Sequence, residues 1–222
     1  ARFQTFKWEQ SLSTRLFSVN CKKCQRLADY LKESRQKYPD YFCKPVPPFG
    51  DSRAKLLIVG LAPGLHGANA TGRPFTGDYA GILLYNTLHK FGFSNQSESS
   101  HLQDGLQLTG ARITNAVKCV PPQNKPTTAE IKTCNQYLQQ ELLALPDNTV
   151  VLALGRIAHE AILRALQIRL KEFPFGHEAI HVIPHHFTLV DSYHCSRYNT
   201  QTRRLTVEQF ENVFARIKTL LN

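Results

Sequence analysis

The chain has 222 residues, with 27 Lys and Arg against 17 Asp and Glu, so its net charge is +10 at neutral pH. Hydrophobic residues make up 42% of the sequence and charged residues 20%, which excludes a wholly disordered, collagen-like or coiled-coil chain. The length suits one large α/β domain or two small ones. No apolar run is long enough to span a membrane, and residues 1–20 mix charged and apolar side chains, unlike a signal peptide.

The positive charge has two explanations. Basic surfaces keep many proteins soluble, and they also attract the phosphates of nucleic acid. The charge alone does not separate the two. Its distribution is uneven, because residues 1–44 hold ten Lys and Arg and four Asp and Glu, which places +6 of the +10 in the first fifth of the chain.

In chain order, the apolar pattern predicts helices first and then alternating strands and helices. Two helices are expected at the start, Phe6–Val19 and Gln25–Lys37, followed by the proline-rich connector Pro45–Gly50. The expected strands are Lys55–Gly60, Arg112–Cys119, Thr149–Gly155, Ile180–Pro184 and Phe187–Tyr193. The later expected helices are Tyr79–Phe91 with Ile82 facing inward, one from the capping box at Thr127 to about Leu145, Arg156–Leu166, and one that starts after Thr206. Strands that alternate with helices indicate an α/β fold with a parallel sheet covered on both faces.

Four of the six cysteines form a candidate metal or cluster site. Cys21 and Cys24 make a C-x2-C pair, and Cys119 and Cys134 follow with 14 residues between them. Disulfides are disfavoured because nothing indicates secretion, and a redox C-x2-C is expected after a strand rather than beside helices. Zinc remains possible, although zinc ribbons usually repeat C-x2-C, whereas an iron–sulfur cluster tolerates this irregular spacing.

Polar residues gather where the predicted strands end. The first strand leads into a glycine-rich loop that contains Phe75 and Asp78, the second ends in Asn115, and the last ends at His194. Parallel sheets bind ligands at the carboxyl ends of their strands, and the loop matches neither common nucleotide motif. An aromatic ring, a carboxylate, a carboxamide and an imidazole suit one planar ligand. Each also has a purely structural explanation, such as a helix cap for Asp78 or plain core for Phe75.

At these residues the chain resembles the uracil-DNA glycosylase superfamily, and most closely family 5, the type B enzymes with an iron–sulfur cluster. The resemblance is carried by three segments, Gly60–Asp78, Thr114–Pro126 and Ser192–Thr206, and by the four cysteines. It covers about residues 20 to 216. One departure is His194-Cys195-Ser196, where the family usually has His-Pro-Ser, so the backbone after the histidine loses the restriction that proline imposes.

The resemblance implies a single three-layer α/β/α domain over residues 1–222, with a central, mainly parallel four-stranded sheet. It implies that uracil, and other deaminated bases such as hypoxanthine and xanthine, are flipped out of double-stranded DNA and cut from the sugar to leave an abasic site. Asp78 would position the water, and His194 would donate to the base oxygen that gains charge. The base would contact Gly60, Leu61, Phe75, Asn115 and His194.

The resemblance also assigns the remaining roles. The residues expected to bind DNA are Arg73, Ser196, Arg197, Tyr198 and Arg203. A [4Fe–4S] cluster, with zinc as the alternative occupant, would be held by Cys21, Cys24, Cys119 and Cys134, and would tie the basic segment 1–45 to the core. The histidines at positions 177, 181, 185 and 186 are expected to lie on the surface or to support the pocket, not to bind a metal.

Two other functions stay open at this point, a damage-sensing DNA-binding module without activity and a hydrolase of free nucleosides or nucleotides. The chain is expected to be a monomer in the cytoplasm without membrane contact.

Overall fold

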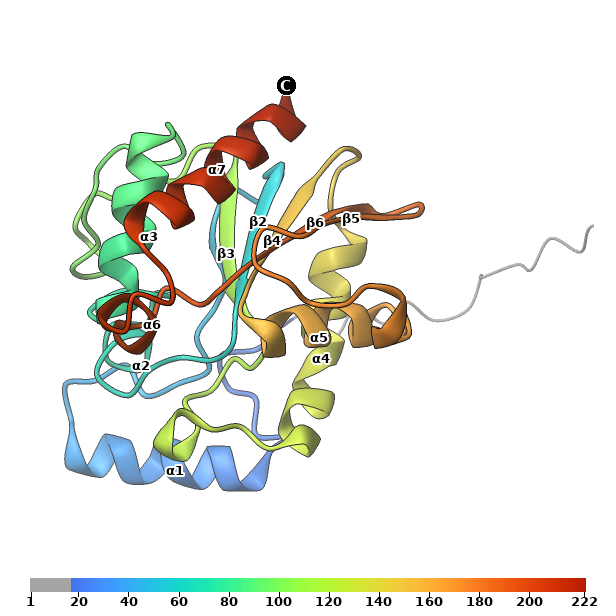
Figure 1. Ribbon diagram of the computed structural model, residues 1–222. Coiled ribbons are helices and arrows are strands. Elements are labelled where there is room, and N and C mark those ends of the chain that lie inside the picture. Colours follow the sequence, from blue (N-terminus) through green and yellow to red (C-terminus); the bar gives the residue numbers. More distant parts are fainter. Residues whose placement is uncertain (1–16) are drawn as a thin grey trace, which may run out of the picture.

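The computed structural model describes residues 17–222. Within them, one mixed sheet runs through the molecule in the strand order β1-β3-β2-β4-β6-β5 (Figure 1). The strands are β1 (Phe49–Gly50), β2 (Leu56–Gly60), β3 (Ala111–Asn115), β4 (Val150–Leu154), β5 (Ile180–Ile183) and β6 (Phe187–Ser192). The four central strands pair in parallel, and β1 and β5 are antiparallel edges. The predicted four-stranded parallel sheet is therefore confirmed, with an antiparallel strand added at each edge.

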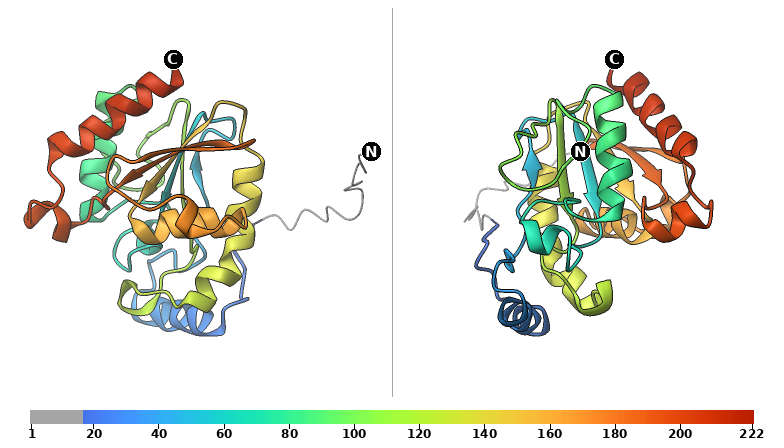
Figure 2. Two further views of the ribbon diagram at one scale, coloured as in Figure 1. Left: turned by 45° about the vertical axis from the view of Figure 1, so that its right-hand side comes forward. Right: turned by 90° about the vertical axis from the view of Figure 1, so that its left-hand side faces the viewer.

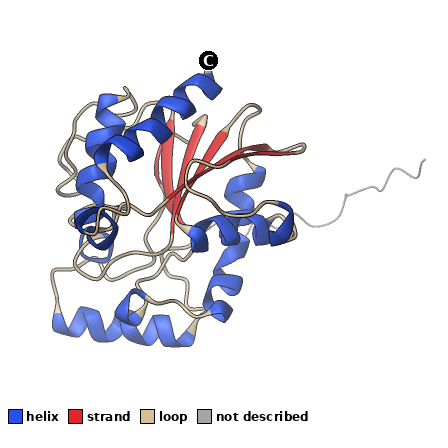
Figure 3. Ribbon diagram, in the orientation of Figure 1, coloured by secondary structure: helices blue, strands red, loops and turns tan. Residues whose placement is uncertain are grey.

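Helices cover both faces of this sheet, which makes the three layers (Figures 1 and 2). The α-helices are α1 (Gln25–Lys37), α2 (Ala68–Thr71), α3 (Tyr79–Lys90), α4 (Thr128–Leu143), α5 (Arg156–Ala165), α6 (Arg197–Gln201) and α7 (Val207–Leu221). Two 3-10 turns, Pro122–Asn124 and Leu170–Glu172, precede α4 and β5. Figure 3 shows the strands enclosed between these helices. The predicted three-layer α/β/α arrangement is confirmed.

Strand β2 shows how the sheet packs against the helices on both of its faces. Leu56 and Ile58 pack into the core formed with α3 and α7, whereas Leu57 and Val59 pack into the core that α4 and α5 cover. All four side chains are fully buried. Successive side chains of a strand point to opposite faces, so an unbroken apolar run is what a strand buried on both faces requires.

Most predicted element boundaries hold within a few residues. The predicted strand Arg112–Cys119 is too long, because β3 ends at Asn115. Beyond it, the amide of Val117 donates to the Leu61 carbonyl and that of Lys118 to the Cys134 sulfur. The predicted inward position of Ile82 is wrong, since this side chain is 59% exposed.

The sequence does not predict the short elements β1, α2 and α6. It does predict two capping boxes, and the structure contains both. Thr127 and Thr206 each accept from the backbone amide three residues on, and Glu130 and Gln209 reach back to the cap residue. The predicted helix Phe6–Val19 lies almost entirely outside the described residues, and residues 17–19 are not helical. No helix within residues 17–222 is both long and apolar enough to cross a membrane.

Candidate active site at the strand ends

A pocket of about 370 Å³ lies at the carboxyl ends of β2, β3 and β6. It brings together seven residues that the sequence singles out, namely Leu61, Phe75, Asp78, Asn115, His194, Ser196 and Arg197. Ligand sites of α/β sheets are expected at this position. This pocket is called the strand-end pocket below.

Glycine at position 60 lets an aromatic ring and an amide approach the same backbone. A methyl group added at Gly60 would come within 2.5 Å of Asn115 Oδ1 and 2.6 Å of Phe75 Cζ. The ring of Phe75 is held there by a backbone turn with φ of 53°, a value that few non-glycine residues adopt. A methyl group at Gly81 would overlap the carbonyl oxygen of Phe75. The Phe75 ring therefore depends on glycines at both positions, and its unusual φ is typical of a functional site.

Asn115 presents an unused acceptor to the pocket. Its side chain is buried, yet Oδ1 has no hydrogen-bond partner among residues 17–222. A buried polar atom without a partner costs about 1–3 kcal/mol, so it needs an explanation. A ligand that donates a hydrogen bond at this point would satisfy Oδ1.

Asp78 is both a helix cap and a pocket residue, so its predicted structural role and its predicted functional role are compatible. It is the N-cap of α3, and Oδ1 accepts from the Gly81 amide at 3.0 Å. Its other oxygen, Oδ2, faces Gly64 and Gly67. Burial raises the pKa of Asp78, and the backbone amides of Gly81 and Ala80 oppose that rise. A carboxylate fixed by its own helix can position a water molecule or face a developing cation.

His194 lies across the pocket from Asp78 and is neutral at pH 7. Its ring stacks on Phe75, with centroids 5.9 Å apart and planes 29° apart. Burial lowers its pKa to about 4. A neutral imidazole can donate one N–H to an oxygen that gains negative charge, as an uncharged electrophile.

The loop after His194 is held without the proline that the family usually has there. The Asn199 side-chain amide donates to the His194 carbonyl at 2.8 Å, and Ser196 caps α6 through the Asn199 amide. Cys195 is completely buried in the core shared with α3 and α7, and burial raises the pKa of its thiol. Hydrogen bonds and packing therefore fix this loop, and the thiol faces the core.

Exposed groups follow His194 on α6 and in the turn after it, and one of them, Arg197, lies at the rim of the strand-end pocket. The Arg197 guanidinium lies 5.1 Å from the centre of the Tyr79 ring, and Tyr198 is 70% exposed. Arg203 is also exposed. All three residues are open to solvent, and their contacts with DNA stay a prediction.

The prediction that Arg73 binds DNA is wrong. Its side chain is 2% exposed, and its guanidinium pairs with Asp104 at 2.9 Å. It also donates to Ser99 and to the Leu102 carbonyl and lies over the Phe49 ring. With both of its terminal nitrogens hydrogen-bonded inside the protein, Arg73 is a structural residue that fastens the loop before α3 to the 99–104 loop.

Two residues of the strand-end pocket were not foreseen. Tyr79 and Asn124 line the strand-end pocket, and only the position of Tyr79 next to Asp78 could have pointed to it. An adjoining cavity of about 340 Å³ shares Leu61 and His194 with that pocket. Its remaining charged and aromatic lining consists of Arg156, Phe175, Tyr193 and Arg204. There Arg156 lies over Phe175 and Arg204 over Tyr193, so arginines and aromatic rings extend the site beyond the base-sized pocket.

A second pocket brings the four predicted cysteines together. It is lined by Cys21, Cys24, Cys119 and Cys134, and also by Phe17, Lys118 and Tyr137. This pocket is called the cysteine pocket below. All six cysteines of the chain lie within the described residues and are free thiols.

The donors around the sulfurs fit a group that carries negative charge. The Lys118 amide donates to Cys134 Sγ and the Tyr137 hydroxyl donates to Cys21 Sγ, each at 3.3 Å. The Lys118 side chain is buried at the same pocket, where it pairs with Glu141 and Thr114. Four thiols in one mostly apolar pocket, with hydrogen-bond donors to sulfur, are the donor set of a thiolate-bound metal or iron–sulfur cluster.

Comparison with known proteins finds the family that the sequence resembles. The model of the family described as the uracil DNA glycosylase superfamily matches residues 47–218. A type-5 uracil-DNA glycosylase of Thermus thermophilus is 46% identical over 205 residues, which cover 90% of this chain and 93% of the relative. A type-5 uracil-DNA glycosylase of Pyrobaculum aerophilum is 39% identical over 213 residues, which cover 94% and 92%. A type-4 uracil-DNA glycosylase of Archaeoglobus fulgidus is more distant, 32% identical over 151 residues that cover 68% of this chain and 62% of the relative.

Proposed function

The chain belongs to the uracil-DNA glycosylase superfamily, and we propose that it removes uracil from DNA with the strand-end pocket as its active site. The observation that carries the proposal is the buried, unpartnered Oδ1 of Asn115 beside Phe75 and His194. A base inside a duplex cannot reach this pocket, so the nucleotide must be flipped out of the stack.

In this proposal, one pocket residue acts on the base and another acts on the sugar. The bond between the base nitrogen and C1′ of the sugar breaks, and its electron pair stays on the base. His194 donates an N–H to the base oxygen on which this charge gathers. Asp78 faces the cationic sugar and orients water, whose oxygen bonds to C1′ and whose proton passes to the carboxylate. The products are the free base and an abasic site, and no lysine in the pocket lining provides a strand-cutting step.

The same pocket supports other deaminated bases as substrates. Deamination turns an amino group into a carbonyl beside a ring N–H, in uracil as in hypoxanthine and xanthine. The Asn115 side chain can accept from that N–H through Oδ1 and donate to that carbonyl through Nδ2. We therefore extend the proposal to hypoxanthine and xanthine in double-stranded DNA.

The cysteine pocket suits a [4Fe–4S] cluster bound by Cys21, Cys24, Cys119 and Cys134. When bound, the cluster would act as a cross-link, because its four ligands come from the segment before α1, the loop after β3 and the helix α4. On this proposal, residues 1–45 are a basic part of one domain with the rest of the chain, and the protein acts as a monomer. Zinc is the alternative occupant.

One experiment tests the proposed activity. Duplexes that carry uracil, hypoxanthine or xanthine are incubated with the protein, and abasic sites are then cleaved with alkali. Strand breaks are expected at each of the three bases, and none in matched duplexes with cytosine or adenine, which lack the ring N–H beside a carbonyl that Asn115 would bind. Binding to abasic DNA without any breaks would mean a damage-sensing module, and release of base from free deoxyuridine alone would mean a nucleoside hydrolase.

A further inference from the structure

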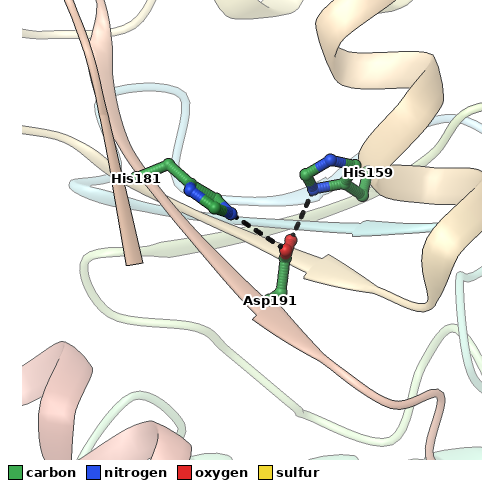
Figure 4. Close-up of side chains that lie close together, drawn as sticks. All are labelled: His159, His181 and Asp191. Carbon is green, nitrogen blue, oxygen red and sulfur yellow. Dashed lines mark hydrogen bonds and ion pairs between the residues drawn. The ribbon is translucent and has the colours of Figure 1, made fainter. Parts of the chain in front are cut away.

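A second cluster of potential metal ligands lies outside both pockets. His159 of α5, His181 of β5 and Asp191 of β6 point toward one another across a gap between helix and sheet (Figure 4). Their candidate ligand atoms all lie within 4.8 Å of one another. The side chains of Asp191 and His159 are 0% and 2% exposed, and that of His181 is 13% exposed. The sequence predicts that His181 lies on the surface or supports the pocket, because the spacing of the histidines at positions 177, 181, 185 and 186 repeats no known ligand set. The two residues that His181 meets, His159 and Asp191, lie outside that group.

The hydrogen bonds of His159 define which of its nitrogens is free. Nε2 lies 2.9 Å from the Phe173 carbonyl oxygen, which can only accept, so Nε2 carries the proton. In the neutral ring, Nδ1 then holds a lone pair. This lone pair points at Asp191 Oδ1, which is 2.8 Å away and is also an acceptor. Two acceptors at this distance require a positive charge, either a proton on the line between them or a cation that lies beside that line and binds both.

His181 adds a third group that lacks a partner. Its Nε2 lies 3.4 Å from Asp191 Oδ2, but the alignment is not that of a hydrogen bond, and this buried nitrogen has no hydrogen-bond partner in the part of the chain that the structure describes. An extra proton on His159 would satisfy the contact with Asp191 and leave His181 unsatisfied. One divalent cation would meet all three groups.

We propose that His159 Nδ1, His181 Nε2 and Asp191 form a binding site for a divalent metal ion of the zinc class. Two imidazoles and a carboxylate are a ligand set that zinc takes. The bond from His159 Nε2 to a backbone carbonyl is the outer contact that metal-bound histidines usually make, and it fixes the ring orientation. The rings of Phe173 and Phe175 lie edge-on to His181 and His159 respectively, with centroids 5.6 Å apart in each pair, and they shield the site.

The ion would fasten three elements that meet behind the active site. Asp191 precedes His194 by three positions on the strand that leads into the pocket, and the Gly176 amide lies 3.4 Å from Asp191 Oδ2. Phe175 and Gly176 line the cavity next to His194. Metal at this site would hold α5, β5, β6 and the loop 173–176 in fixed relation, as a structural staple. It is chemically distinct from the cysteine pocket, which offers sulfur ligands.

Zinc uptake by the whole protein tests the proposal. The iron-containing protein is stripped of loosely bound metal, equilibrated with zinc chloride, passed through a desalting column and analysed for zinc and iron. Wild-type protein should retain about one zinc ion per chain with its iron unchanged. A zinc concentration about 100-fold above Kd should raise Tm by roughly 5 °C.

Two variants separate this site from other binding. His181→Gln should weaken zinc binding in calorimetric titration by about 10-fold or more, the scale that even outer contacts of a metal site carry. His186→Gln, an exposed histidine on the same hairpin, should bind zinc as the wild type does. No zinc uptake by wild-type protein, equal uptake by His181→Gln, or uptake matched by loss of iron would overturn the proposal, and each of these outcomes can be read without an activity measurement.

Discussion

The strand-end pocket and the cysteine pocket start from the same piece of chain and are built for different tasks. Asn115 ends β3 in the first pocket, and Cys119, four residues later, lines the second. The strand-end pocket takes its groups from the ends of sheet strands and from one short loop, so the fold fixes them already. The cysteine pocket joins segments about a hundred residues apart in sequence. Changes in the first should alter chemistry more than stability, and changes in the second should do the reverse.

The sharpest test of this contrast is Asp78→Asn. Asparagine caps a helix as well as aspartate does, so α3 should keep its start while the carboxylate is lost. We expect excision of uracil in single-turnover assays to fall by roughly 1000-fold, the upper range for loss of one electrostatic group in an active site, with Tm nearly unchanged.

Thr206→Asn is the matched control for that variant. It makes the same kind of cap replacement at the start of α7, away from the pocket, and should leave both rate and Tm close to wild type. If Asp78→Asn kept more than a tenth of the wild-type rate, Asp78 would be only a helix cap.

The converse test is Cys24→Ser in the cysteine pocket. Loss of one ligand should release the bound group and with it the link between residues 21–24 and the core. A cross-link that closes so long a loop contributes about 3 kcal/mol or more, so denaturant unfolding should shift by that order, and trypsin should cut sooner at Lys22 and Lys23. The excision rate of the folded fraction at low temperature should stay within about threefold of wild type.

Cys43→Ser controls for the loss of a thiol as such. Cys43 is buried, whereas Cys24 is partly exposed, and Cys43 lies near Asn69 and outside the cysteine pocket. It should keep its iron and lose about 1 kcal/mol of stability at most. Equal losses of stability in both variants would mean that the cysteine pocket does not tie the segment down.

The pH profile should separate the two titratable groups of the strand-end pocket. Asp78 must be charged to act, and burial raises its pKa above the ordinary 3.8. The excision rate should therefore fall with decreasing pH on the acid side, approaching tenfold per pH unit below that pKa. His194 stays neutral until about pH 4, so it should not cause that fall.

Two variants show which residue causes the fall in rate at low pH, called the acid limb here. His194→Gln should lower the rate throughout and keep the limb, whereas Asp78→Asn should abolish it. Stability responds with the opposite sign for the two groups. Between pH 6.5 and 4 the unfolded chain binds a proton at His194 that the folded protein does not, so this group lowers stability as the pH falls. The raised pKa of Asp78 favours the folded state as the pH falls. An acid limb that vanished in His194→Gln instead would reverse the roles assigned to the two residues.

How much of this could be foreseen depends on how local each feature is. Apolar runs such as Leu56–Gly60 and the capping boxes at Thr127 and Thr206 are local signals, and the elements follow them. The strand-end pocket was foreseen because the ends of parallel strands meet at one edge. The four cysteines were also foreseen to meet although they are distant in sequence, because their residue type and the C-x2-C pair mark them. Other contacts between distant segments were not foreseen. Nothing near Arg73 in the sequence indicates its ion pair with Asp104, 31 residues away, and nothing near His181 indicates His159.

The smallest effect is expected at the rim of the strand-end pocket, where Arg197 should strengthen the binding of DNA and take no part in cleavage of the glycosidic bond. Its guanidinium is exposed and lies over Tyr79, so Arg197→Ala should leave Tm unchanged. Loss of one phosphate contact should weaken duplex binding by about 3- to 10-fold and reduce the slope of log Kd against log salt by about 1. Arg73→Ala should do the opposite, because it leaves Asp104 with backbone amides as partners but without its opposite charge, and it should cost roughly 3 kcal/mol of stability. A salt slope that did not change in Arg197→Ala would place the bound DNA away from α6, and the positive charge of the rim would then serve another purpose.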